Sequence, residues 1–557
     1  MEKKSARLGD ILISMNEINN KQLNEAISEQ ETLDIKLGEI LIERGYTTEL
    51  SVIRALSQQT GIEWINLDNY AINIDAAKKI SEKLARRTCS IPVDIAGNKL
   101  LVVMNDPLNI INIEDIELES SMKVEAAFGL KSQIIETIDK FMSSRNTELA
   151  AKEVKASNNI EEASAASSTD SAINSSPVVK LINSLISHAV KSDASDIHME
   201  PFENMVRIRF RIDGDLHEIL NIDIVSHSAM VTRVKVMANL NIAEKRLPQD
   251  GRIEMDVDST EIDLRISIMP TVYGEKIVIR ILNRGSFLKT KNELGFTKEN
   301  IKLFDTIIEA PHGMILVAGP TGSGKTTTMY AYLNELNKIT KNIITVEDPV
   351  EYKIEGINQV QINPKIGLTF ANGLRSILRQ DPDIIMIGEI RDSETAEIAV
   401  RAAITGHLVI STIHTNDAPS TVVRLQDMGI SSYLIAASLK GILAQRLVKR
   451  ICSNCSIEYL SSEADMDILE LKEETMLYRG VGCPKCYNTG YRGRIAIHEI
   501  LKMDKEMSDV IYRGGSVEEL AALAESKGMK LLKENCRILV LDGITTVDEY
   551  SQVIFKM

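Results

Sequence analysis

The chain has 557 residues. A single hydrophobic core does not normally support a chain of this length, so three or four domains are expected. Its hydrophobic content of 44% and charged content of 26% are ordinary for a globular protein. The net charge of -15 argues against a general nucleic-acid binder, which normally carries a basic excess, so we expect no nucleic-acid partner.

Membrane spans and signal sequences are not expected. No apolar run approaches the roughly 18 residues that cross a bilayer, and the basic start leads into only a short apolar stretch before Asn16. We therefore expect a cytoplasmic protein. Four of its six cysteines form two CxxC pairs, and in a reducing compartment this pattern favours metal binding over disulfides.

The first expected domain, residues 1–61, contains an internal repeat. The pattern RLGDIL begins at Arg7 and returns as KLGEIL at Lys36, 29 residues later. Each copy predicts a short helix, a turn at Asn16 or Gly45, and a longer amphipathic helix. The simplest interpretation is a small helical bundle with a purely structural repeat.

Three further segments are expected between residues 62 and 286. Residues 62–142 alternate strand and helix patterns and predict a compact α/β module. Residues 143–176 hold nine Ser and seven Ala without Gly or aromatics, and we interpret them as a flexible linker. Residues 177–286 predict a strand-rich α+β domain with a hairpin turn at Asp213-Gly214.

A phosphate loop gives the strongest signal in the sequence. An apolar strand leads into a G-x-x-x-x-G-K-[ST] pattern, and a helix follows without a breaker, over an expected α/β domain of residues 287–450. Glycines let backbone N–H groups face the phosphates of ATP, Lys325 reaches the β and γ phosphates, and the Thr326 hydroxyl ligates Mg²⁺. The expected ATP/Mg²⁺ residues are Gly319, Pro320, Thr321, Gly322, Ser323, Gly324, Lys325, Thr326 and Thr327.

Three later strands end in polar residues. NIITVEDPVEY ends in Glu347-Asp348, DIIMIGEIRD ends in Gly388-Glu389, and HLVISTIHTNDA delivers His414. Because the carboxyl ends of parallel strands converge on a ligand crevice, we expect these side chains to face the nucleotide. Alternatively, the acids are solvent-exposed loop charges and the histidine is hydrogen-bonded within the protein, and none of them has a catalytic role.

Together these motifs resemble the secretion ATPase superfamily of type II secretion and type IV pili, and within it the pilus assembly (extension) ATPases. The resemblance covers essentially the whole chain. It implies an α/β, RecA-like P-loop ATPase domain with an upstream PAS-like α+β domain. It further implies a homo-hexamer, peripheral at the cell membrane, that acts on an inner-membrane platform protein and indirectly on pilin.

The resemblance also implies roles for individual residues. Glu389 takes the Walker B role on Mg²⁺, Glu347 in the acidic box is the general base, and His414 contacts the γ-phosphate side. Arg265 and Arg280 match the arginines that the family brings to the nucleotide, where they would stabilise the charge of phosphoryl transfer. As plain surface charges on strands they would need no function.

A tetracysteine follows the ATPase motifs. Two CxxC pairs with 27 residues between them can hold structural Zn²⁺, and disulfides are the alternative. The pairs fall in an expected zinc subdomain, residues 451–500, before a helical region of residues 501–557. The resembling assembly ATPases share this element, whereas retraction ATPases lack it. Its ligands would be Cys452, Cys455, Cys483 and Cys486.

The N-terminal repeat resembles a domain that binds cyclic di-GMP in some of these ATPases, with Asn16 in place of one expected glycine. A ligand-free domain that docks on the platform protein is the alternative. The residues that fit the ligand-binding pattern are Arg7, Leu8, Gly9, Leu37, Gly38 and Gly45.

Other functions fit the same residues. A type II secretion ATPase is the nearest alternative to a pilus-assembly motor, and the sequence separates the two poorly. A DNA translocase is disfavoured by the acidic balance and the lack of an aromatic-basic stripe. A nucleotide-binding scaffold without hydrolysis is disfavoured by the complete set of Lys325, Thr326, Glu347 and Glu389.

Overall fold

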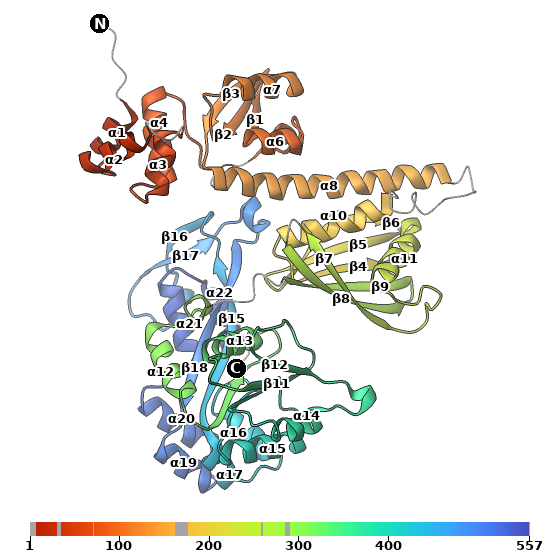
Figure 1. Ribbon diagram of the computed structural model, residues 1–557, viewed down its shortest axis with the longest axis vertical. Helices are drawn as coiled ribbons and strands as arrows, with labels where there is room; N and C mark the ends of the chain where they lie inside the picture. Colours follow the sequence, from red (N-terminus) through yellow and green to blue (C-terminus); the bar gives the residue numbers. More distant parts are fainter. Residues whose placement is uncertain are drawn as a thin grey trace. The chain divides into compact units, whose positions relative to one another are not determined.

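The computed structural model describes residues 7–30, 35–68, 70, 72–161, 177–257, 260–283 and 290–555. The chain divides into two compact units, one over Met1–Ile253 and Leu264–Ile281 and the other over Glu254–Asp263 and Leu282–Met557. Figure 1 shows the elements of each. Among the described residues, no helix has the length and hydrophobicity needed to cross a bilayer.

The sequence repeat forms two helix pairs, as predicted. They are α1 (Leu8–Ser14) with α2 (Asn20–Gln30), and α3 (Leu37–Glu43) with α4 (Glu49–Thr60). The two connecting turns adopt the same left-handed backbone, with φ of 59° at Asn16 and 69° at Gly45. Asn is one of the few residues that enters this conformation readily, so the turn survives the loss of glycine.

The α/β module follows this bundle. Strands β1 (Ser90–Ala96), β2 (Lys99–Met104) and β3 (Lys123–Phe128) form one sheet in that order. Helices α5 (Ile74–Ala77), α6 (Glu82–Thr88), α7 (Ile110–Ser120) and α8 (Lys131–Glu161) complete it. The central strand β2 is buried through Val102, Val103 and Met104, which is the core expected of such a module.

The flexible-linker prediction is wrong for residues 143–161, because α8 continues through them. Ala, Glu and Lys are strong helix formers, and Thr147 and Val154 are buried on one side of the helix. That side packs along α10 (Pro177–Lys191), where the Thr147 and Ser184 hydroxyl oxygens lie 2.8 Å apart. Composition alone missed this partner helix. Residues 162–176 lie outside the described part of the chain.

The strand-rich domain is a six-stranded sheet in the order β6-β5-β4-β9-β8-β7. Its apolar side chains form the core with α10 and α11 (His227–Met237), and charged side chains alternate with them along the strands. The predicted Asp213-Gly214 hairpin joins β5 to β6. The strands are β4 (Asp196–Pro201), β5 (Met205–Ile212), β6 (Asp215–Asp223), β7 (Gln249–Val257), β8 (Thr260–Thr271) and β9 (Gly274–Asn283).

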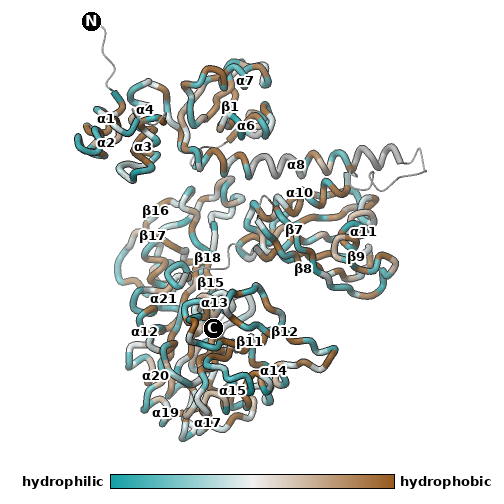
Figure 2. The backbone as a smooth tube through the Cα atoms, in the orientation of Figure 1, coloured by the Kyte–Doolittle hydropathy of each residue, from teal (hydrophilic) through white to brown (hydrophobic). Residues whose placement is uncertain are grey.

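The second unit is built on a seven-stranded sheet in the order β12-β11-β13-β14-β10-β15-β18. All neighbours pair in parallel except β15 and β18, which are antiparallel. Buried clusters lie on both faces, and Figure 2 shows the hydrophobic segments near β11 and β15 inside this unit. The strands are β10 (Gly313–Ala318), β11 (Ile343–Glu347), β12 (Asn358–Gln361), β13 (Ile384–Ile387), β14 (Leu408–Ile413), β15 (Leu439–Ile451) and β18 (Tyr491–Lys502).

The sheet extends beyond residue 450, where the sequence placed the end of the ATPase domain. Strand β18 returns after the cysteine-rich segment and pairs with β15, a long-range pairing that local pattern does not reveal. The small subdomain between them holds β16 (Ser456–Leu460), α18 (Glu463–Leu469) and β17 (Met476–Gly480).

The helices of this unit are α12 (Lys298–Ile308), α13 (Lys325–Leu336), α14 (Phe370–Ile377), α15 (Ser393–Ile404), α16 (Ser420–Asp427), α17 (Ser432–Ser438), α19 (Lys505–Tyr512), α20 (Val517–Ser526), α21 (Leu532–Leu541) and α22 (Val547–Phe555). The last four confirm the helical C-terminal region.

Candidate active site and metal centre

The predicted phosphate loop lies between β10 and α13, as its motif requires. Strand β10 is fully buried, so it fixes the start of the loop, and α13 begins at Lys325. Helix α13 is 12 residues long and directs its N-terminal N–H groups toward the loop, which favours bound phosphate. Thr326 lies in the first turn of this helix and is exposed, whereas its neighbour Lys325 is buried.

Lys325 is held inside the loop. Its Nζ donates to the Gly319 carbonyl at 2.7 Å and to the Pro320 carbonyl at 3.0 Å. Burial lowers the pKa of Lys325 to about 8, and the nearby charge of Glu389 acts in the opposite direction. The amine therefore lies inside the predicted phosphate loop, and its pKa is sensitive to the Glu389 carboxylate beyond β13.

Glu389 lies directly beyond β13, between two basic side chains. One carboxylate oxygen is 2.5 Å from an Arg391 guanidinium nitrogen, and the other is 3.3 Å from His414 Nε2. Glu389 is 12% exposed and His414 is 42% exposed. Because β13 neighbours β14, the ends of these two strands meet as predicted. Arg391 was not among the residues selected from the sequence.

Glu347 has a different environment. It is 3% exposed at the end of β11, and its carboxylate accepts hydrogen bonds from Thr345 at 2.6 Å, from Gln359 at 3.1 Å and from the Tyr330 hydroxyl. Burial raises its pKa despite these donors. Tyr330 comes from α13, so this carboxylate joins the phosphate-loop helix to the acidic strand.

The three predicted strand-end groups therefore divide into two sets. Glu389 and His414 contact each other, and Glu389 acts on Lys325. Glu347 is instead enclosed by protein donors, of which Tyr330 was not anticipated. A tyrosine five residues after the loop lysine, followed by a glutamate at a strand end, is the signal that could have indicated this pair.

The candidate arginines lie in the other unit, on one polar face of the six-stranded sheet. Arg280 on β9 contacts Asp196 at 3.0 Å, and Arg265 lies on the adjoining strand β8. The pattern VRIRFRI on β5 adds three more arginines, of which Arg209 makes a double hydrogen bond to Glu200. Burial acts to raise the pKa of Glu200, but the hydrogen-bonded charges of Arg209 and Lys276 hold it down to about 2. The face is rich in arginine donors, as a phosphate-facing surface would be.

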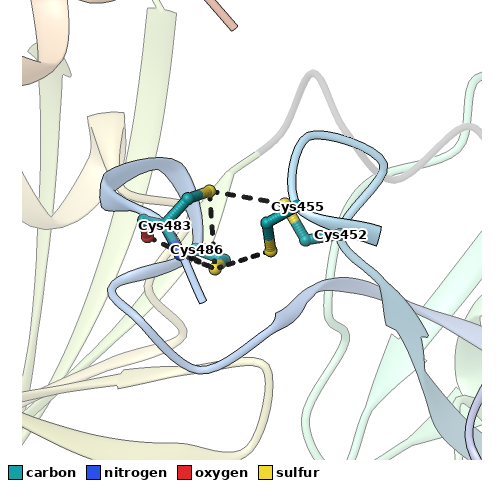
Figure 3. A group of neighbouring side chains, drawn as sticks. All are labelled: Cys452, Cys455, Cys483 and Cys486. Carbon is teal, nitrogen blue, oxygen red and sulfur yellow. Dashed lines mark hydrogen bonds between the residues drawn. The ribbon is translucent and has the colours of Figure 1, made fainter. Parts of the chain in front are cut away.

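The four cysteines of the two CxxC pairs meet as predicted, and Figure 3 shows their sulfur atoms turned toward one another. The Sγ atoms of Cys452 and Cys483 are 3.8 Å apart, as are those of Cys455 and Cys486. Tetrahedral Zn²⁺ with Zn–S of about 2.3 Å requires sulfurs about 3.8 Å apart, whereas a disulfide requires about 2.05 Å. The donor set and its spacing therefore fit a structural zinc ion.

Backbone groups support this cluster. The N–H groups of Cys483 and Gly490 each approach the Cys486 sulfur at 3.2 Å, and the Asn454 amide approaches the Cys483 sulfur at 3.4 Å. Such donors stabilise thiolates and orient metal ligands.

The residues selected in the N-terminal repeat differ in accessibility. Arg7 and Gly45 are exposed, and nothing lies within 4 Å of the position that a Gly45 Cβ would take. Gly9 and Gly38 are buried where α1 and α3 pack on neighbouring helices. A Cβ atom at Gly9 would lie 2.6 Å from Leu23, and one at Gly38 would lie 2.9 Å from Val52, so neither position has room for a larger side chain. Helix packing thus accounts for these two glycines, while Gly45 lies in an exposed turn.

Leu8 and Leu37 complete that set and are partly buried against the helical core, where they pack with Leu12 and Leu41. Their positions in the two copies correspond, which confirms the register of the repeat.

Comparison with known proteins agrees with this arrangement. The sequence model described as "Type II/IV secretion system protein" matches residues 171–552, and the "MshEN domain" matches residues 60–148. The second match covers the α/β module and not the helical repeat. The "Type IV pilus assembly ATPase PilB" of Myxococcus xanthus is 42% identical over 555 residues, which cover 98% of each chain.

Two further comparisons extend this. The "Type II secretion system protein E" of Dickeya dadantii is 49% identical over 377 residues, covering 68% of this chain and 76% of that one. Among solved structures, the Legionella pneumophila ATPase DotB matches 68% of this chain and 95% of its own with a TM-score of 0.51, at 20% identity. That likeness concerns the fold.

Proposed function

This chain belongs to the family of Type II/IV secretion system proteins and is an ATPase, and we propose that it powers the assembly of type IV pili. The observation that carries the proposal is the match to a pilus assembly ATPase over 98% of both chains, which includes the N-terminal segments as well as the motor. The intact phosphate loop and its neighbouring acids supply the hydrolytic chemistry.

In this mechanism the loop binds the phosphates of ATP, and Lys325 places a positive charge at their β and γ positions. The Thr326 hydroxyl and Glu389 would hold Mg²⁺, which would supply positive charge beside the phosphates. His414 would lie beside the γ-phosphate, because it contacts Glu389. An arginine such as Arg265 or Arg280 would add a donor when the strand-rich domain closes on a nucleotide.

We assign activation of the attacking water to Glu347. Its raised pKa makes it a stronger base than an exposed glutamate, which supports the role. Its low exposure sets a condition, because water must replace the Tyr330 hydroxyl at the carboxylate. Glu351, four residues later and partly exposed, is the rival base within the same acidic box.

Single substitutions separate these assignments. Glu347→Gln, Glu351→Gln and Glu389→Gln each keep shape and remove charge. If Glu347 is the base, Glu347→Gln lowers kcat by about 10²-fold or more and leaves ATP binding intact. A variant Glu351→Gln with that loss, beside an active Glu347→Gln, would transfer the role to Glu351. Glu389→Gln with full Mg²⁺-dependent turnover would remove its Walker B role.

The biological role needs a separate test. In a host that lacks its own pilus assembly ATPase, expression of this chain should restore surface pili, and the Lys325→Ala variant should not. Restored secretion without pili would instead support a type II secretion motor, which the 49% identity over the motor region favours as a second candidate.

The proposal includes a homo-hexamer at the inner face of the cell membrane, working on a platform protein there. Ring formation would let the arginine-rich face of one domain respond to the nucleotide state of another. Light scattering with Mg²⁺ and a non-hydrolysable ATP analogue tests the assembly, since a mass near six chains is expected.

We further propose Zn²⁺ in the tetracysteine and cyclic di-GMP at the N-terminal repeat. The sulfur spacing supports the first. Exposed Arg7 and the open turn at Gly45 support the second, with Leu8 and Leu37 as apolar surface. Gly9 and Gly38 would act only by allowing the helices to approach. Titration of labelled cyclic di-GMP against the full chain and its Arg7→Ala variant tests the site.

A further inference from the structure

A glutamine on β15 lies against the phosphate loop. Gln445 is 2% exposed, and its strand pairs in parallel with β10, from which the loop departs. It is separated from the loop residues that it contacts by 117 and 122 positions in the chain. None of the roles derived above includes it.

The Gln445 carboxamide makes two hydrogen bonds to the loop region. Its Nε2 donates to the Ser323 carbonyl at 2.8 Å, and its Oε1 accepts from the Thr328 hydroxyl at 2.7 Å. Ser323 precedes Lys325 by two residues and Thr328 follows it by three. The Gln445 amide therefore binds one residue before Lys325 and one residue after it in the chain. A single amide can do this because it carries both a hydrogen-bond donor and an acceptor.

These contacts are buried. Ser323 is 3% exposed and Thr328 is fully buried, so water cannot replace a lost partner. Buried polar groups without partners carry a desolvation penalty, and the loop would shift to recover hydrogen bonds elsewhere.

The strand also explains two loop glycines. A Cβ at Gly319 would lie 2.5 Å from the Gln445 carbonyl oxygen, and a Cβ at Gly324 would lie 2.9 Å from Gln445 Nε2. Both glycines have positive φ, 149° and 84°. The loop is therefore packed directly on β15 and takes its shape partly from that strand.

We propose that Gln445 is a positioning residue for ATP, which holds Ser323 and Thr328 so that the loop amides and Lys325 face the phosphates. It touches neither the nucleotide nor the reacting atoms. Its loss weakens nucleotide binding and leaves the chemical step of bound ATP nearly unchanged. The proposal rests on the ATPase function proposed above, and the wild-type Kd for MgATP, measured alongside, separates failure of one from failure of the other.

Three substitutions test both ends of the contact. Gln445→Met keeps the approximate length and removes both hydrogen bonds. Thr328→Val removes one partner hydroxyl, and Thr328→Ser keeps it. We expect Gln445→Met and Thr328→Val to raise the Kd and KM for MgATP about tenfold, with kcat within about threefold of wild type. Thr328→Ser should keep the wild-type Kd. The Gln445→Met/Thr328→Val double variant should raise the Kd little more than either single substitution, because each single substitution already removes the hydrogen bond between Gln445 and Thr328.

A matched control residue contacts the same strand from the segment between α21 and α22. Thr545 is fully buried and donates to the Lys449 carbonyl of β15 at 2.7 Å, four residues beyond Gln445. Thr545→Val removes an equivalent hydroxyl away from the loop, so it should lower thermal stability and leave the Kd unchanged. The proposal is overturned if Thr328→Val binds MgATP like wild type, or if Thr545→Val and Thr328→Ser weaken binding equally. These outcomes hold even where Gln445→Met fails to fold.

Discussion

The affinity for ATP should depend on pH through Lys325. Burial lowers its pKa to about 8 in the free protein, and bound phosphates must raise it because they favour the charged amine. A group whose pKa is higher in the complex loses binding energy as the pH rises through its free value. The protonated fraction falls from about nine-tenths at about pH 7 to about one-tenth at about pH 9, so the Kd should rise about tenfold.

The charge of Glu389 sets the position of this transition. It raises the pKa of Lys325 against the effect of burial, so Glu389→Gln should move the rise in Kd to lower pH. Glu394→Gln is the matched control, because Glu394 is exposed and pairs with Arg375 away from the loop. It should leave the transition in place.

Isothermal titration with a non-hydrolysable ATP analogue and Mg²⁺, from about pH 6.5 to about pH 9.5, measures the effect. Buffers with different ionisation heats would also report the proton taken up on binding above pH 8. A Kd that stays constant across this range would refute the reasoning, as would an identical transition in the Glu389→Gln variant.

Further predictions concern the metal, the acidic strand and the repeat. Cys486→Ser should lose about one zinc ion per chain by elemental analysis and lower the Tm, whereas Cys536→Ser should retain the metal. Because burial raises the pKa of Glu347, the free energy of unfolding should fall as pH rises through that value, and denaturant titrations of Glu347→Gln should lack this fall. Gly38→Ala should destabilise the N-terminal unit by about 1–3 kcal/mol in calorimetry, since its Cβ would lie 2.9 Å from Val52, while Asn16→Gly should be tolerated.

Local pattern was sufficient where the chemistry is local. The phosphate loop, the two helix pairs of the repeat and the CxxC pairs each follow from residues within a short window, and the structure confirms their elements. That Glu389 and His414 lie at one edge of the sheet was also predicted, because the carboxyl ends of parallel strands converge. The pairing of β13 with β14, which makes the two residues neighbours, came from the structure.

Composition failed where long-range packing decides. Residues 143–161 are rich in Ser and Ala, yet they form the end of α8, because α10 covers their apolar side. Strand β18 pairs with β15 of the ATPase sheet after the cysteine-rich segment, and no local sequence pattern predicted this pairing.

The sequence by itself determined the phosphate-loop motif and so predicted where ATP binds, since the spacing of the glycines and the lysine is a property of one continuous segment. Only the tertiary structure decided what surrounds that loop. Tyr330 meets Glu347 on the next element, β11, through a side-chain hydrogen bond. Gln445 meets Thr328 and Ser323, which are 117 and 122 positions away in the chain. Such contacts depend on burial and three-dimensional proximity, and neither property is written in local spacing.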